Sequence, residues 1–145
     1  MIVYGADEAV AKWVSLNLTG LDDSYEKYSA IGIVKDEQLI AGVVYSNYQP
    51  NILIEMHIFS IDKRWCNRHT LRKIFCYPFI QLNLERTQAI CSADNEGVHV
   101  FLEKIGFTRE GYHRKAYFDG SDAVSFGMLK SECKWLPAST EMLGG

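Results

Sequence analysis

The feature of the sequence that most constrains its fold is a change of hydrophobic period in the middle of the chain. Apolar residues alternate over 52–60, recur at helical spacing over about 67–82, and give way to a further strand pattern over 86–92. A strand, a helix and a second strand in this order form a βαβ unit, whose two strands run parallel. The chain is therefore predicted to fold around a sheet that contains a parallel pair.

The remaining elements follow from the same two periods. Pro78 is expected to kink the helix of 67–82 or to end its regular part. Gly106 suits the left-handed end of a helix that begins at Asp94 or Asn95. A further helix is predicted over 6–18, and strands over 29–35, 38–47, 107–118 and 123–131, with turns at Asp36–Glu37 and Asp119–Gly120. This order predicts an α/β (α+β) fold with a mixed, mostly antiparallel central sheet of about six strands and helices on both faces.

Length and charge set the domain organisation and narrow the class of partner. The chain has 145 residues, a length that suits a single domain, which is predicted over 1–136 with a flexible tail over 137–145. Its net charge is -3. The negative charge makes nucleic acid an improbable partner, because nucleic-acid binders usually carry a basic surplus. One basic cluster nevertheless stands out, since no acid interrupts residues 63–73. It contains Lys63, Arg64, Arg68, Arg72 and Lys73.

The cysteines and the hydropathy pattern point to a cytoplasmic protein. Neither the 4 cysteines nor the 4 histidines show the close spacing of metal ligands, so no metal site is predicted. Scattered cysteines in apolar runs are typical of free thiols in a reducing compartment. No apolar run approaches the ~20 residues that span a bilayer, so no membrane segment is expected. The first residues also lack the features of a signal peptide.

Residues 95–107 carry the clearest family signal. They read N-x-x-V-x-x-F-L-E-x-x-G-F, and Glu-Gly-Tyr follows at 110–112. Together with the order of elements, this pattern resembles the GNAT superfamily of Gcn5-related N-acetyltransferases over about residues 28–132. Residues 95–112 look most like the ribosomal-protein-type N-acetyltransferase branch, and the whole chain is similar to short GNAT-like proteins of phages and prophages.

The resemblance implies an acetyl-CoA site in a splay between strands 52–60 and 86–92. The pantetheine of the cofactor would pair with backbone near 59–61. Its pyrophosphate would meet the start of helix 67–82, where free N–H groups and the helix dipole favour an anion and where the basic cluster lies. The cofactor-binding residues implied in this way are Phe59, Ser60, Ile61, Arg64, Asn67, Arg68, His69, Thr70, Asn95, Phe101 and Lys104.

Three positions depart from the family's pattern. The phosphate loop of GNAT proteins usually reads Gln/Arg-x-x-Gly-x-Gly/Ala, whereas residues 64–69 read RWCNRH. Asn67 replaces the first small residue and is expected to substitute for it, because asparagine tolerates left-handed φ. His69 places a bulky ring where backbone should approach phosphate. Leu102 stands where many members have a tyrosine that protonates the leaving thiolate.

Glu55 and His57 are the candidate catalytic bases. Alternation places them on the same face of their strand, about 6–7 Å apart by its rise. Many GNAT enzymes use a glutamate on this strand as general base, so Glu55 is the first candidate and His57 the second. Alternatively, the two side chains line a polar groove or pair with each other. Tyr112 is the candidate acid for the leaving thiolate, with Tyr117 and Ser92 as alternatives.

Three functions are compatible with the sequence. The first is an acetyl-CoA-dependent N-acyltransferase acting on a primary amine of a small molecule or protein. The second is a GNAT-fold binding protein of phage type that has lost catalysis, and the third is a nucleic-acid base modifier. The acceptor amine is not readable, because the first helix and the strand hairpin tips, where this fold usually builds substrate specificity, carry no recognisable motif. Four tyrosines are candidates to line such a site, but packing on the sheet is the favoured role for them: Tyr25, Tyr28, Tyr45 and Tyr48. Homodimers are common in this fold.

Overall fold

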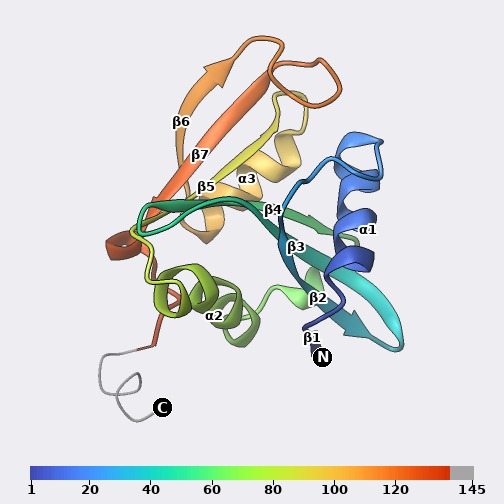
Figure 1. The fold of residues 1–145 in the computed structure, drawn as a ribbon, viewed down its shortest axis with the longest axis vertical. Coiled ribbons are helices and arrows are strands. Elements are labelled where there is room, and N and C mark those ends of the chain that lie inside the picture. The colour runs from blue at the N-terminus through green and yellow to red at the C-terminus, as the bar shows by residue number, and fades with distance from the viewer. Residues whose placement is uncertain (138–145) are drawn as a thin grey trace.

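A computed structural model describes residues 1–137, and the predicted tail lies outside this range except for its first residue. A seven-stranded sheet forms the centre of the molecule (Figure 1). The strands are β1 (Ile2–Val3), β2 (Ser29–Lys35), β3 (Gln38–Gln49), β4 (Leu53–Ser60), β5 (Arg86–Ser92), β6 (Thr108–His113) and β7 (Ala123–Leu129). The α-helices are α1 (Asp7–Thr19), α2 (Arg68–Cys76) and α3 (Glu96–Ile105), and short 3-10 turns are η1 (Lys63–Trp65) and η3 (Lys130–Glu132).

The sheet has the order β1-β2-β3-β4-β5-β7-β6. Every neighbouring pair is antiparallel except β4 and β5, which run parallel on either side of the α2 crossover. The predicted mixed sheet and its parallel pair are therefore confirmed. The sequence underestimates the strands by one, because β1 is only two residues long and is defined by its pairing with Gly32 and Ile33 of β2.

The parallel pair separates after three residues. Leu53, Ile54 and Glu55 of β4 pair with residues 86–88 of β5, and the pairing ends there. Beyond Glu55, β4 continues as far as Ser60 along β3, while β5 continues along β7. The sheet therefore opens into a fork, as the resemblance implied, and Figure 1 shows β5 and β7 diverging from β4 and β3.

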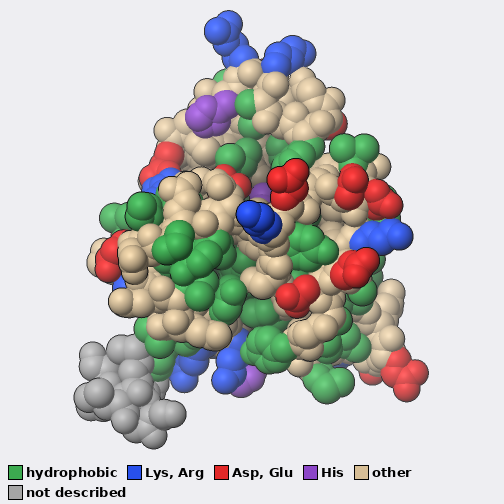
Figure 2. Space-filling view, viewed as in Figure 1, with side chains coloured by type: hydrophobic (Ala, Val, Ile, Leu, Met, Phe, Trp, Pro, Cys, Tyr) green, Lys and Arg blue, Asp and Glu red, His purple; other side chains and the backbone are tan. Residues whose placement is uncertain are grey.

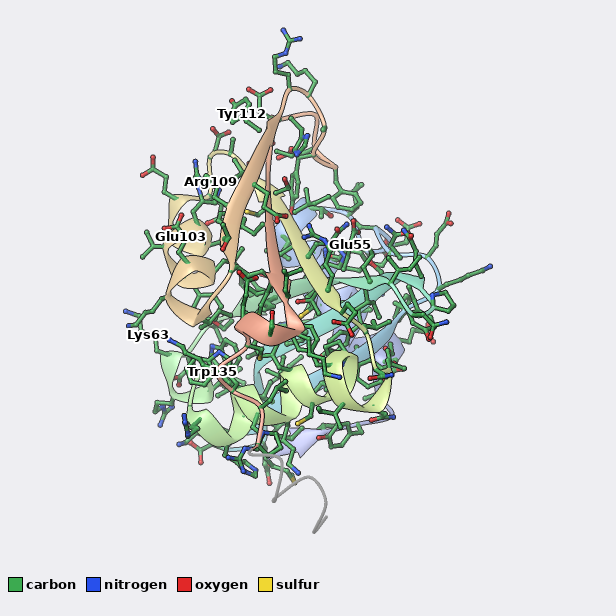
Figure 3. The ribbon with its side chains drawn as sticks, turned by 90° about the vertical axis from the view of Figure 1, so that its left-hand side faces the viewer. Glu55, Lys63, Glu103, Arg109, Tyr112 and Trp135 are labelled. Carbon is green, nitrogen blue, oxygen red and sulfur yellow. The ribbon has the colours of Figure 1, made fainter. Side chains whose placement is uncertain are left out.

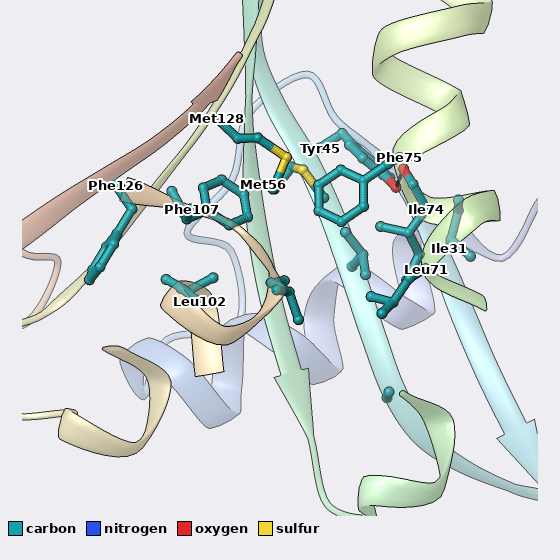
Figure 4. Close-up of a cluster of buried hydrophobic side chains, with 14 of the residues drawn as sticks. Ile31, Tyr45, Met56, Leu71, Ile74, Phe75, Leu102, Phe107, Phe126 and Met128 are labelled. Atoms are coloured by element: carbon teal, nitrogen blue, oxygen red, sulfur yellow. Dashed lines mark hydrogen bonds between the residues drawn. The ribbon is translucent and has the colours of Figure 1, made fainter. Parts of the chain in front are cut away.

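The helices cover both faces of the sheet, as predicted. Helix α1 packs on β2, β3 and β4 on one face. It can approach closely because Gly42 has no side chain, since a Cβ there would lie only 2.7 Å from the Val14 side chain. Helices α2 and α3 cover the opposite face, where Phe75, Leu102 and Met56 belong to the larger core cluster (Figure 4). Full burial of each such side chain stabilises the fold by about 1.5–3 kcal/mol.

Two elements end earlier than predicted. The α-helix predicted over 67–82 ends at Cys76 and continues as a π-helical turn, Tyr77–Gln81, so the expected break at Pro78 is confirmed. The strand predicted over 107–118 is wrong in its second half, because β6 ends at His113. A loop follows instead, which Asp122 closes by accepting a hydrogen bond from the Lys115 backbone N–H.

Candidate active site at the sheet fork

A groove of about 830 Å³ lies on the α2 and α3 side of the sheet. Its walls come from the unpaired end of β4, the start of α2 and one side of α3. Seven of the eleven predicted cofactor-binding residues line it, namely Phe59, Ser60, Asn67, Arg68, Asn95, Phe101 and Lys104. The other four, Ile61, Arg64, His69 and Thr70, lie outside the lining. The structure therefore brings most of the predicted set together.

Two asparagines at this groove cap the helices that form its walls. The Asn67 side chain accepts a hydrogen bond from the backbone N–H of Thr70, and that of Asn95 accepts one from the N–H of Val98. The predicted cap at Asn95 is confirmed. The left-handed conformation expected for Asn67 is wrong, because its φ is -131° and the residue is extended, as an N-cap requires.

The groove is positively charged. Four cationic side chains line it, Lys63, Arg68, Lys104 and Lys134, and no aspartate or glutamate does. The N-terminus of α2 adds its helix dipole, so the groove suits a polyanion. Arg64 does not contribute in this way, because it forms an ion pair with Asp62 and lowers the pKa of that carboxyl to about 2.

A second cavity, the cleft, has a volume of about 630 Å³ and opens on the α1 side of the sheet. Glu55 and His57 both line it, which confirms that they share a face of β4. The loop before β2 contributes Tyr25, and the loop after β6 contributes Phe118. Figure 2 shows acidic side chains gathered over α1 and the loop that follows it. Two cavities therefore flank the fork, one on each face.

Burial keeps His57 uncharged at neutral pH. The ring is 5% exposed, stacks on Tyr25 with 4.3 Å between ring centroids, and its Nε2 lies 2.7 Å from the Ser46 hydroxyl. Burial lowers the pKa of His57 to about 4. His57 and Glu55 do not pair with each other, because Glu55 has a different partner, Gln88.

Glu55 sits where the sheet divides. Its Oε1 accepts a hydrogen bond of 2.9 Å from the side-chain amide of Gln88, the last residue of β5 that pairs with β4. Gln88 in turn accepts a hydrogen bond from Arg86, which forms an ion pair with Glu110. This chain of contacts fixes the carboxylate of Glu55 at the opening, where it faces the cleft.

The candidate acids bond to residues other than Glu55. Tyr112 stands near the end of β6, where its hydroxyl donates to Asp122 (Figure 3). Leu102 is buried in the core, so the position of the family tyrosine carries no proton donor. The two alternatives, Ser92 and Tyr117, bond to Ser121 and to the Leu18 carbonyl oxygen respectively, and burial raises the pKa of Tyr117 to about 12. Neither cavity is lined by any of these candidates.

The sequence did not single out two residues that the structure places at the cavities. Gln88 holds Glu55, and Trp135 lines the groove although it follows the last strand. Alternation along β5 could have suggested that Gln88 is on the same face as Glu55, but not that the two are opposite each other. Of the four tyrosines considered for the acceptor site, Tyr25 and Tyr48 line the cleft, whereas Tyr45 belongs to the core.

Comparison with known proteins supports the fold. No protein-family model and no curated protein matches the sequence. Among solved structures, a probable acetyltransferase is 26% identical with a TM-score of 0.63, over 73% of this chain and 64% of its own. A mutant of the spermidine N-acetyltransferase SpeG from Vibrio cholerae is 19% identical with a TM-score of 0.61, over 81% and 72%. A GCN5-related N-acetyltransferase from Brucella melitensis is 20% identical with a TM-score of 0.61, over 75% and 54%.

These similarities identify the fold as that of the GNAT acetyltransferases. The chain spans just under two thirds of the length of the probable acetyltransferase. Within residues 1–137, no helix is long and apolar enough to cross a membrane. The same residues contain no cluster of three or more side chains suited to hold a metal ion.

Proposed function

We propose that the protein is an N-acyltransferase that moves the acetyl group of acetyl-CoA to a primary amine of a small molecule or a protein. The observation that carries this proposal is the fork that opens beyond the pair Glu55 and Gln88. It lies between a cationic groove on one face and a cleft with a carboxylate on the other. A thioester that enters the fork from the groove would meet an amine that enters from the cleft.

The groove supports donor binding by its backbone as well as its charge. Beyond Glu55, the edge of β4 that faces β5 has no strand partner, so its backbone groups are available to the amides of pantetheine. Lys63, Arg68 and the N-terminus of α2 suit the pyrophosphate. Acetyl-CoA would supply the activated acyl group, and the residues of the chain would bind and orient it.

In the proposed reaction the neutral amine nitrogen attacks the thioester carbonyl carbon. A C–N bond forms, the C–S bond breaks, and a water molecule passes the amine proton to Glu55. Gln88 keeps the carboxylate in position through the hydrogen bond described above. The thiolate leaves without a protein acid and takes a proton from solvent, because an ordinary thiol has a pKa of about 8.5. Tyr112 has no part in this scheme.

The test combines calorimetry with an assay of free thiol. The protein is titrated with acetyl-CoA and then supplied with primary amines, beginning with polyamines, since solved structures with this fold include spermidine N-acetyltransferases. We expect saturable binding, thiol release only when amine is present, and an acetylated amine by mass spectrometry. Absence of binding at millimolar acetyl-CoA would refute the proposal. Binding without transfer to any amine would favour the alternative of a binding protein that lacks catalysis.

A further inference from the structure

A line of polar side chains crosses the sheet from β6 to β4 and ends at Glu55. Glu55 accepts a hydrogen bond from Gln88 of β5, and Gln88 accepts one of 3.1 Å from the Nε of Arg86. Both guanidinium Nη atoms of Arg86 contact the carboxylate of Glu110 in β6, at 2.5 and 3.2 Å. Because β7 lies between β5 and β6, this ion pair has to pass over the strand that separates its partners.

Two local irregularities make room for the ion pair. Gly127 is the residue of β7 beneath it, since a Cβ there would lie 2.5 Å from Arg86 Nη1 and closer still to Glu110. The register of β6 against β7 shifts between Arg109 and Gly111, so Glu110 is the extra residue of a bulge. A bulge re-aims a side chain. A missing side chain in β7 and an extra residue in β6 therefore meet at one contact.

The contact with Arg86 decides which end of the Gln88 amide faces Glu55. A glutamine amide keeps its shape when it turns over, so its orientation follows from its hydrogen-bond partners. A guanidinium has donors only, so Arg86 takes the amide oxygen and leaves the NH₂ group for the carboxylate of Glu55. In the opposite orientation the amide oxygen would face the carboxylate, and two acceptors repel each other.

We propose that Arg86 is a positioning residue for Glu55 and that it acts through Gln88. It keeps the donor end of the amide turned toward the carboxylate, while Glu110 and the gap at Gly127 keep the guanidinium in place. The side chains of Arg86 and Glu110 are 27% and 40% exposed, so their ion pair contributes little to stability. This inference rests on the proposed function, because it gives Arg86 a task in amine acetylation.

The test compares kcat for amine acetylation with binding and stability in variants of the full chain. Arg86→Met removes the donor and keeps an aliphatic stem, and Gln88→Met removes the amide. Gly127→Ala places a methyl group beneath the ion pair, whose two side-chain ends are able to move aside, so the fold should tolerate it. Steady-state kinetics measure kcat and KM, calorimetry measures the affinity for acetyl-CoA, and thermal unfolding measures stability.

We expect Arg86→Met and Gln88→Met each to lower kcat about tenfold, because a loosely held base is less often in the productive geometry. The affinity for acetyl-CoA and the KM of the amine should stay within about twofold of the wild type. The double variant should lose no more activity than Gln88→Met alone, because Arg86 acts only through the amide.

Gly127→Ala separates the positioning role from a structural one. It should lower kcat severalfold, because the methyl group displaces the guanidinium from Gln88, and it should lower the melting temperature by less than about 4 °C. Added to Arg86→Met, it should have no further effect on kcat, because the ion pair that it displaces is already absent.

A wild-type kcat in Arg86→Met would overturn the positioning role and leave the proposed function intact. A tenfold loss that persists when Arg86→Met is combined with Gln88→Met would also overturn it, because Arg86 would then act elsewhere. The same holds for a loss that appears in KM or in acetyl-CoA affinity and not in kcat. If the wild type acetylates no amine, the proposed function fails and this role fails with it, so the wild-type rate distinguishes the two failures.

Discussion

The two cavities lie on opposite faces of one sheet and differ in charge and in how their walls are built. The groove is lined by four cations and no acid, and helix ends and the edge of β4 form its walls. The cleft is lined by three acids, Asp23, Glu26 and Glu55, and one cation, Lys27. One cavity therefore suits an anionic donor and the other a cationic acceptor, although both meet at the same three-residue strand pair.

This difference shows how the fork can keep two ligands apart until they react. A polyphosphate is attracted to the groove and repelled by the carboxylates of the cleft, and an ammonium experiences the reverse. Glu55 stands at the division, and its partner Gln88 is the last paired residue of β5. If this comparison is correct, substitutions on each side should affect one ligand and spare the other.

The largest effect is expected at Glu55. Glu55→Gln keeps the size of the side chain and can still bond to Gln88, but it cannot accept a proton. Since a positioned general base contributes about 10²–10⁴-fold, kcat for amine acetylation should fall at least about 100-fold. The affinity for acetyl-CoA should stay unchanged. Steady-state kinetics and calorimetry on the same preparation measure the two quantities.

Glu103→Gln provides a matched control, because this exposed glutamate of α3 lines neither cavity and its one ion-pair contact within residues 1–137 is a long one, 3.9 Å to Arg109. Its kinetics should match those of the wild type. Full activity of Glu55→Gln would exclude the carboxylate as base and would remove the chemical difference between the two sides of the fork.

The second effect concerns stability in acid and belongs to the cleft side. The folded protein binds a proton on His57 with a pKa of about 4, whereas the unfolded chain does so near the ordinary value of about 6.5. Stability from this residue is therefore fully present above pH 6.5 and is lost as the pH falls toward 4. The loss amounts to about 3 kcal/mol at 1.36 kcal/mol per pKa unit.

Urea unfolding of the wild type and of His57→Gln between pH 7.5 and 4 measures this loss. The variant removes the titration and keeps a polar group near Ser46, so the difference between the two proteins isolates His57. The groove side should contribute little in this range, because its lining contains no histidine, aspartate or glutamate. Parallel pH curves for the two proteins would show that His57 is not buried in solution.

The parts that the sequence predicted are those set by local periodicity. The parallel pair, the cap at Asn95 and the shared face of Glu55 and His57 follow from spacing along single elements. The contact of Glu55 with Gln88 depends on the register between two strands that are 33 positions apart, which no local pattern specifies. The contact of Trp135 with Ile105 likewise joins segments 30 positions apart.

The errors have local causes too. Residues 114–118 include an aromatic pair that fits a strand, but backbone hydrogen bonds between Tyr117 and both Gly120 and Ser121 form a tight turn there. For Asn67, the family pattern favoured a glycine-like conformation. The helix start favoured an extended N-cap instead, because the side chain then satisfies the Thr70 N–H.

A third effect distinguishes two arginines at the start of α2. Arg68 lines the groove, whereas Arg64 is paired with Asp62 outside it. Arg68→Ala should weaken acetyl-CoA about tenfold at low salt, and the loss should shrink as salt rises, because the contact is with a phosphate. Arg64→Ala should change the affinity less than about twofold. Calorimetry at two salt concentrations measures both, and equal effects would mean that the basic cluster acts only as a diffuse charge.

The smallest effect is expected at the rim of the cleft. Asp23→Asn combined with Glu26→Gln removes two exposed negative charges from its lining. Because exposed charges act weakly and are screened by salt, KM for a diamine should rise only about threefold at low salt, with acetyl-CoA affinity unchanged. Lys27→Gln should lower KM by a similar factor, since it removes the one cation of the lining.

The matched control for the rim is Asp36→Asn combined with Glu37→Gln, at the turn between β2 and β3. It changes the net charge by the same amount, and neither residue lines a cavity. If this control raises KM as much as the rim variant, the preference comes from total charge and not from the cleft. If only the rim variant does so and the effect disappears at high salt, the acids of the cleft select the acceptor by attraction at short range.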